Sequence, residues 1–188
     1  MAKNKVEFGI SNLHVGTYDV VEGVVTLGTP YHQAGAVSFS PSEDSNENIF
    51  YADNIAYFSE YSDGATSGDL VVALFDEEFK TQFLGYKRTT DGGLAKVKNA
   101  VKPKTYVAFE VVGDKESRRV IYYNCSLGAI TREYTTIEDS KSPNTETISM
   151  TSAGDSVSGI GCAVYKPGDT GYATLFTNPT APQIATEP

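Results

Sequence analysis

Apolar and polar residues alternate with a period of two over much of the chain, as they do in strands that bury one face. Residues 5–10 (KVEFGI) place Val, Phe and Ile on one side and Lys, Glu and Gly on the other. Residues 15–28 continue with β-branched residues interrupted at Gly23, and residues 34–42 alternate until Pro41 ends the pattern. The first part of the chain is therefore predicted to form strands.

A polar stretch separates these strands from an aromatic region. Residues 40–48 (SPSEDSNEN) contain no residue that could build a core, so the sequence predicts a loop there. Residues 49–64 (IFYADNIAYFSEYSDG) indicate two strands that meet at Asp53-Asn54, a pair that tolerates the left-handed conformation of a tight hairpin turn. Asp63-Gly64 is predicted to form the next turn.

The sequence predicts one helix, which follows this aromatic region. Asp69 is placed to cap its first turn, and Gly85 is placed to end it in the left-handed conformation. Apolar residues recur between them at helical spacing and form one stripe, which consists of Val72, Phe75, Phe79 and Phe83 with Leu74 beside them. The acidic residues at 76–78 lie mostly off this stripe and are expected to face solvent.

Strand patterns return after the helix. Residues 105–127 (TYVAFEVVGDKESRRVIYYNCSL) show the strongest hairpin pattern, with Val107, Phe109 and Val111 on one face and the turn at GDKES. Residues 145–155 and 159–166 supply further strands. The C-terminal half is therefore predicted to be β-structure as well.

The predicted fold class is mainly β: a β-sandwich or barrel of two sheets with one flanking α-helix. No linker divides the chain of 188 residues, so one domain is expected over residues 1–176. Residues 177–188 contain three prolines and are expected to form an extended or disordered tail. The unpaired backbone groups at the edges of a sheet must be shielded or paired with a neighbouring strand. The sequence shows few of the features that shield these edges in a solitary sandwich.

Composition and charge narrow the range of functions. A net charge of −9 argues against binding of nucleic acid, because phosphates require clusters of Lys and Arg. The lysines within residues 92–104 (GGLAKVKNAVKPK) are spaced apart, which favours a solvated loop over a phosphate-binding patch. No apolar run approaches the ~18 residues of a membrane span, and the start MAKNKVEFG lacks the apolar segment of a signal peptide. We expect no membrane contact and folding in a cytosol.

Residues that could perform chemistry are few. His14 and His32 stand apart in the sequence, and Cys125 and Cys162 lie in strand-like segments where buried, reduced and inert thiols are expected. No zinc-ligand spacing, nucleophile elbow or phosphate loop is present. Scattered carboxylates leave glycoside hydrolysis open, although the chain has no Trp to build a carbohydrate platform. The sequence predicts no enzyme, no catalytic residue, no cofactor and no metal site.

Several ordered segments resemble one known family. FYADNIAYF (residues 50–58), GDLVVALFDEEFKTQFLGYKRTTDGGL (residues 68–94) and YVAFEVVGDKESRRVIYYNCSL (residues 106–127) are followed by TREYTTIEDSKSPNTETISMTSAGD (residues 131–155). In this order they are similar to the major tail proteins, or tail tube proteins, of long-tailed, non-contractile bacteriophages. The resemblance covers almost the whole chain, from about Val6 to Tyr165, and rests on the ordered set of segments rather than on one motif.

The resemblance implies a structural function. In this family six copies of a β-sandwich close into a ring, and rings stack into a tube through which DNA passes without specific binding. It further implies a homo-oligomer whose partners are the tape measure protein, the tail terminator and the distal tail protein, located in the virion after assembly from the host cytoplasm. Acidic residues that line the lumen would repel DNA phosphates.

The polar segment before the aromatic region is the candidate contact with an adjacent ring, and we expect it to become ordered only in the tube. Its residues are Ser42, Glu43, Asp44, Ser45, Asn46, Glu47 and Asn48. A surface loop with no partner is the alternative interpretation of this segment. For the whole chain, the alternatives are the tube protein of a contractile or secretion-type injection system and a solitary β-sandwich binding module.

Overall fold

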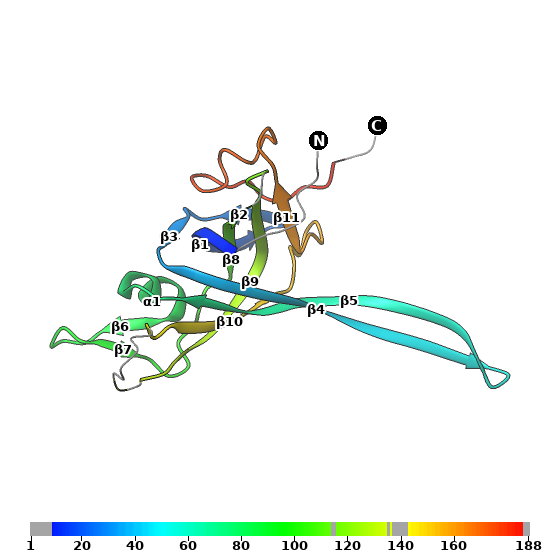
Figure 1. Ribbon diagram of the computed structural model, residues 1–188, viewed down its shortest axis with the longest axis horizontal. Coiled ribbons are helices and arrows are strands. Elements are labelled where there is room, and N and C mark those ends of the chain that lie inside the picture. Colours follow the sequence, from blue (N-terminus) through cyan, green and yellow to red (C-terminus); the bar gives the residue numbers. More distant parts are fainter. Residues whose placement is uncertain (1–8, 114–115, 135, 137–142, 186–188) are drawn as a thin grey trace.

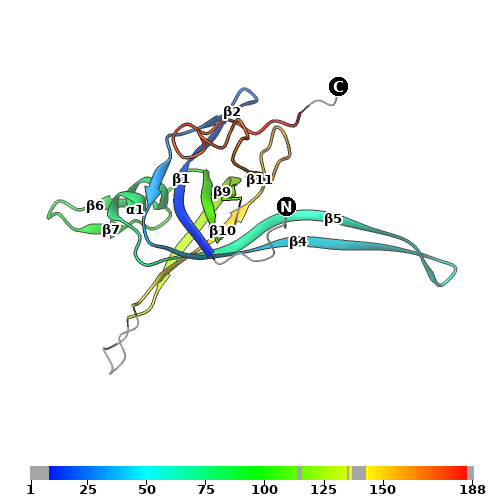
Figure 2. The ribbon, with the colours of Figure 1, turned by 45° about the horizontal axis from the view of Figure 1, so that its top comes forward.

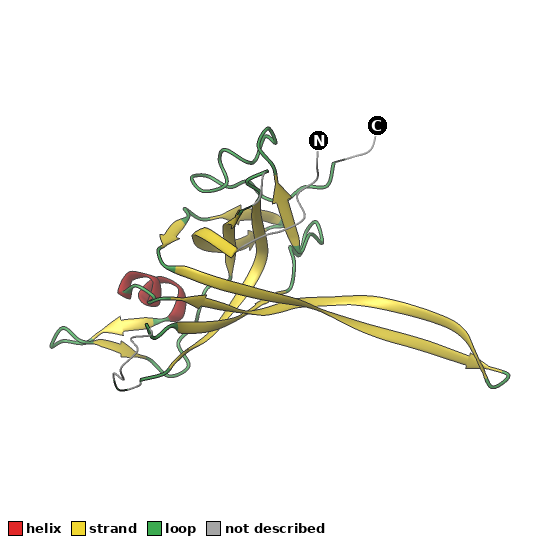
Figure 3. Ribbon diagram, in the orientation of Figure 1, coloured by secondary structure: helices red, strands yellow, loops and turns green. Residues whose placement is uncertain are grey.

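The computed structural model describes residues 9–113, 116–134, 136 and 143–185. The described residues form one α-helix and eleven strands: β1 (Gly9–Val21), β2 (Val24–Leu27), β3 (Tyr31–Gln33), β4 (Ala36–Ala52), β5 (Ile55–Val72), α1 (Glu77–Leu84), β6 (Tyr86–Arg88), β7 (Leu94–Lys96), β8 (Thr105–Val112), β9 (Arg119–Arg132), β10 (Glu146–Ser152) and β11 (Cys162–Tyr165). The predicted fold class, mainly β with one helix, is confirmed (Figure 3).

The two sheets differ greatly in size. Nine strands form one antiparallel sheet in the order β2-β1-β8-β9-β10-β5-β4, with β11 added on β9 and β3 on β1. The second sheet consists of β6 and β7 alone. Figures 1 and 2 show that the strongly curved large sheet forms most of the body of the molecule, with α1 and the β6–β7 ribbon at one end. The strand β4 is therefore an edge of the large sheet.

Strands β8 and β9 bury both faces because apolar side chains occupy both of their alternating sets of positions. Val107 and Phe109 belong to one core cluster, which also contains the buried residues of α1. Tyr106 and Ala108 point to the opposite face, where they pack with Leu175 in a second cluster. The hairpin predicted over residues 105–127 is thus confirmed, and it forms the central layer between two cores.

Two local turns follow the sequence as predicted. The break at Gly23 joins β1 to β2 through Glu22 (φ 52°) and Gly23 (φ 78°), both in the left-handed region. Gly85 ends α1 with φ 72° and donates its N–H to the carbonyl of Lys80. Glycine reaches this backbone region at little cost, so both positions specify where an element stops.

The start of the helix differs from the prediction. Residues Asp69 to Val72 continue β5, and α1 begins only after Asp76. Leu70 pairs with Phe39 of β4 on one side and with Ile148 of β10 on the other. Pairing on both sides satisfies the backbone of this segment in extended form, and this tertiary pairing outweighs the helical spacing of its side chains. Leu74, predicted beside the stripe, is 60% exposed.

The remaining stripe residues pack as predicted. Phe75, Phe79 and Phe83 are each at most 2% exposed. The ring of Phe79 lies 4.8 Å from that of Phe75 and 5.1 Å from that of Phe83, measured between centroids, and Tyr31 covers it from β3. These aromatic contacts fix α1 against the sheet.

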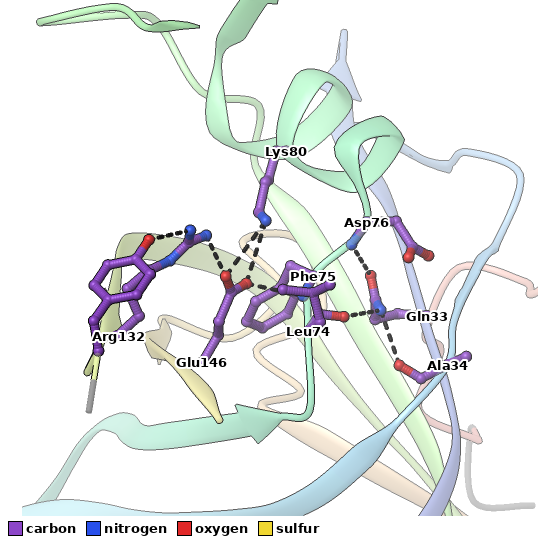
Figure 4. A network of polar contacts seen from close by, with 9 residues as sticks. Gln33, Ala34, Leu74, Phe75, Asp76, Lys80, Arg132 and Glu146 are labelled. Atoms are coloured by element: carbon purple, nitrogen blue, oxygen red, sulfur yellow. Dashed lines mark hydrogen bonds and ion pairs between the residues drawn. The ribbon is translucent and has the colours of Figure 1, made fainter. Parts of the chain in front are cut away.

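A buried polar network holds the connection between β5 and α1 (Figure 4). The carboxylate of Glu146 accepts the N–H of Phe75 at 2.9 Å, lies 3.3 Å from Lys80 Nζ and forms an ion pair with Arg132. The side chain of Gln33 donates to the carbonyl of Leu74 at 3.1 Å and accepts the N–H of Asp76. The carbonyl of Leu74 and the N–H groups of Phe75 and Asp76 thus each have a side-chain partner inside the body.

We expect Glu146→Gln to destabilise the subunit by roughly 3 kcal/mol, because Lys80 would keep a buried charge without its carboxylate. The free energy of unfolding in urea measures this. Glu77→Gln is the matched control: it removes an ion pair with Arg88 in which both side chains are more than 60% exposed, and its effect should stay below about 1 kcal/mol. If the two substitutions lowered the free energy of unfolding by the same amount, burial of the Glu146–Lys80 pair would not be the cause of its contribution to stability.

In the C-terminal segment, residues 177–185 contain neither helix nor strand. Pro179 and Pro182 are nevertheless buried, so this part of the chain lies along the body. No helix in the described ranges is both long and apolar enough to span a membrane.

Candidate functional site

The most prominent feature is a long hairpin that leaves the body. Strand β4 has 17 residues and β5 has 18, and they pair with each other from Ala36↔Val72 to Ala52↔Ile55. Strand β10 supports β5 only as far as Thr66. Beyond that point the hairpin is a two-stranded ribbon that extends away from the rest of the molecule (Figures 1 and 2). We call residues 43–65 the arm.

The tip of the arm confirms one predicted turn. Asp53 (φ 53°) and Asn54 (φ 62°) both adopt the left-handed conformation and join Ala52 to Ile55. Two consecutive residues with positive φ are typical of the tightest hairpin turns, whose twist matches that of the strands they connect. The turn therefore closes the arm without a loop.

The predicted turn at Asp63-Gly64 is wrong. Asp63 pairs with Ser45, and the strand continues through Gly64 toward the body. A Cβ atom at Gly64 would lie 2.9 Å from the carbonyl oxygen of Asp44. The glycine therefore permits close approach of the two strands, next to the register shift between Glu43 and Ser45.

The predicted polar loop is also wrong as secondary structure. Residues 42–48 lie in β4, with partners that run from Ser42↔Ser67 to Asn48↔Glu60. Pairing with β5 satisfies the backbone groups that face β5, and those on the outer edge remain exposed to solvent, so the segment needs no core residue to be a strand. All seven candidate contact residues are exposed: Ser42 lies just before the arm, and the six on the arm are Glu43, Asp44, Ser45, Asn46, Glu47 and Asn48.

The arm exposes large apolar side chains on both of its faces. Phe50 and Phe58 are register partners and are 62% and 55% exposed, and Tyr61 on the other face is 65% exposed. The full set of exposed large apolar residues on the arm is Ile49, Phe50, Tyr51, Ile55, Tyr57, Phe58 and Tyr61. Contiguous exposed apolar surface of this kind marks a site of protein contact.

The backbone of the arm also lacks hydrogen-bond partners, in the part of the chain that the structure describes, along the outer edges of its two strands. Within the described residues, β4 pairs only with β5 along its whole length, and the outer edge of β5 has no partner over the arm. An isolated two-stranded hairpin is marginally stable in water, and open edges invite another strand. The arm thus offers hydrogen-bonding edges and apolar faces to a partner outside the molecule.

The sequence pattern predicts the polar half of this site as a contact region but not its aromatic half. It predicts only ordinary strands of the fold for the aromatic residues around Tyr57. A signal was present, since apolar residues from Ile49 to Tyr51 and from Ile55 to Phe58 occupy consecutive positions and so cannot all face one core.

The side chains considered for chemistry lie elsewhere. Cys125 is buried, and burial raises the pKa of its thiol to about 12, which keeps it unreactive. Cys162 is exposed, contrary to the prediction that it is buried. It lies on β11, a strand of four residues that pairs with β9 alone among the described strands. The described residues contain no group of three or more His, Cys, Asp or Glu side chains that could hold a metal ion.

The two histidines are neighbours, contrary to their separation in sequence. His14 of β1 and His32 of β3 are register partners with ring centroids 5.0 Å apart. His14 also stacks on Phe176 at 4.5 Å. Burial lowers the pKa of His14, and the charge of Arg119 acts in the same direction, so the neutral ring is favoured and serves as a packing element.

Comparison with known proteins identifies the family of this hairpin-bearing fold. The family model described as phage tail tube protein matches residues 2–162. The chain belongs to the phage tail tube protein family. A search of the curated proteins found none that matches. Membership makes the chain a structural component of a virion tail, and it confirms the resemblance of its ordered segments.

One solved structure shows the same fold at low sequence identity, and a second is similar over most of the chain. The tube-terminating cap of the anti-feeding prophage has 9% identity and a TM-score of 0.51, and the match covers 88% of this chain and 96% of that one. The sheath/tube terminator of the extracellular contractile injection system PVC has 12% identity and a TM-score of 0.46, with 86% and 98% covered. The first of these places the tail tube protein in the fold of tube-associated proteins.

Proposed function

We propose that this tail tube protein is the subunit of a phage tail tube, in which six copies close into a ring and rings stack through their arms. The observation that carries the proposal is the arm itself, which exposes apolar residues on both faces and leaves both strand edges unpaired. A copy of the same chain can complete such edges by adding strands, and a head-to-tail contact can be repeated without limit.

The proposal assigns no chemistry to the subunit. Its function is to enclose a lumen along which DNA moves, and each copy contributes a net charge of −9. Acidic side chains that face the lumen would keep DNA phosphates from binding to the wall. The proposed partners are a tape measure protein inside the growing tube and terminator and distal tail proteins at its ends.

The proposed assembly proceeds from folded subunits in the host cytoplasm to the virion. Residues 1–176 act as the tail tube domain, and residues 177–188 follow it as a tail. Residues 42–48, which run from the base of the arm along its first strand, are proposed to contact the adjacent ring, and this contact is expected to fix the arm's orientation.

Negative-stain microscopy of the purified full-length chain, over a series of concentrations, tests the proposal. We expect rings at intermediate concentration and hollow tubes at high concentration. Sedimentation velocity on the same samples measures the mass of the ring. A sample that remains monomeric at the highest concentration would contradict the proposal and favour a solitary binding module.

A further inference from the structure

A basic surface lies at the opposite end of the molecule from the arm. Residues 86–104, which we call the basic segment, contain six Lys or Arg residues and a single acid, Asp91. The segment comprises β6, β7 and the connection to β8. Figure 1 shows the β6–β7 ribbon at one end of the longest axis and the tip of the arm at the other.

Three of the six cations already have partners within the body. Arg88 forms an ion pair with Glu77 at 2.7 Å. Lys102 donates to the carbonyls of Leu127 and Gly128, and Lys104 donates to Ser126 Oγ at 2.6 Å. These contacts fasten the second half of the basic segment to β9.

The other three cations are available. Lys87, Lys96 and Lys98 are exposed, and none of their side-chain ammonium groups has an ion pair or hydrogen bond to another described residue. Lys87 of β6 and Lys96 of β7 lie on opposite faces of the same two-stranded ribbon, because Lys87 is paired with Ala95 and Lys96 with Tyr86. Between and beyond them, Val97 is 39% exposed and Val101 is 95% exposed. The basic segment thus combines free positive charge with exposed aliphatic surface.

The arm carries the complementary features. It contains no Lys or Arg and six exposed acids, none of which forms an ion pair with a described residue: Glu43, Asp44, Glu47, Asp53, Glu60 and Asp63. Its exposed aromatic residues would cover aliphatic side chains such as Val101. The arm and the basic segment of one molecule point away from each other, so they cannot meet within one copy (Figures 1 and 2).

We propose that the arm of one copy docks on the basic segment of the next copy in the stack, with its acids facing Lys87, Lys96 and Lys98. The inference rests on the proposed function, because it names the receiving surface of the arm. A strand rise of about 3.3 Å per residue gives the arm a reach of roughly 30 Å, enough to cross from one subunit body to another. The contact is heterologous, so every added copy presents a new arm and a new basic segment.

Paired charge reversal tests this docking. The first variant combines Lys87→Glu, Lys96→Glu and Lys98→Glu, and the second combines Glu43→Lys, Glu47→Lys and Glu60→Lys. Each variant alone places like charges against each other, so we expect the critical concentration for tube formation to rise by more than about tenfold. Mixing the two variants in equal amounts restores opposite charges wherever a copy of one variant contacts a copy of the other, so tubes in which the two variants alternate are expected to form.

All six substituted positions are exposed, so the melting temperature of each variant should match that of the unmodified chain. Tubes formed by the lysine-reversed variant alone, at the normal concentration, would overturn the docking site and leave the proposed function standing. So would failure of the mixture to assemble. If that variant assembles normally and, unlike the unmodified chain, fails to retain added DNA, the basic segment contacts phosphates and not the arm. Absence of tubes from the unmodified chain would overturn the proposed function itself.

Discussion

Shortening the arm is expected to abolish tube formation and to leave the subunit folded. Ser45 and Asp63 are register partners, so replacing residues 46–62 with Asn-Gly would close the hairpin by a two-residue turn without a register change. The deleted residues belong to neither core cluster. They do include all seven exposed large apolar side chains of the arm, each of which contributes roughly 1.5–3 kcal/mol when fully buried.

Microscopy of concentrated protein and thermal unfolding of the same sample separate the two effects. The matched control replaces only Asp53-Asn54 with Asn-Gly, which retains the turn type and the length of the arm, and this chain should assemble normally. Tubes of ordinary length from the shortened chain would show that the arm does not join copies. A large fall in melting temperature would show that the arm stabilises the subunit itself.

Phe79→Asp is expected to unfold the subunit. The Phe79 side chain is 0% exposed and lies between the rings of Phe75 and Phe83. Truncation of a buried phenylalanine alone costs roughly 3–5 kcal/mol, and a carboxylate without a partner in this cluster adds a desolvation penalty. Because the total stability of a domain is roughly 5–15 kcal/mol, the sum removes most or all of it.

Circular dichroism and the dispersion of amide proton resonances measure the loss of structure. Leu74→Asp is the matched control, since it introduces the same carboxylate in place of an apolar residue that is 60% exposed. That variant should unfold cooperatively within a few degrees of the unmodified chain. An unchanged melting temperature for Phe79→Asp would mean that α1 does not depend on this face.

The sequence was sufficient where local pattern and tertiary pairing agree. The β8–β9 hairpin, the turn at Asp53-Asn54 and the helix end at Gly85 are specified by neighbouring residues, and each has the predicted conformation. These features need no knowledge of distant contacts, because alternation and positive φ are properties of short segments.

Prediction failed where the partner is distant or outside the molecule. The sequence predicts Asp69 as a helix cap, but strands β4 and β10 pair on both sides of its segment and hold it in β5. Residues 42–48 resembled a loop because their only structural support is the facing strand β5. The aromatic side chains of the arm have no role inside the subunit, so no pattern based on a core could assign one to Tyr57 or Phe58.

The way the arm is anchored has a mechanical consequence. The body is layered, with a sheet between two packed clusters, whereas the arm is a single ribbon with two register shifts, between Glu43 and Ser45 and between Phe50 and Tyr51. Bending a layered core requires side chains to repack, but bending a bare ribbon changes only its twist. A stack joined through such ribbons would bend at the contacts between rings, while each subunit body keeps its shape.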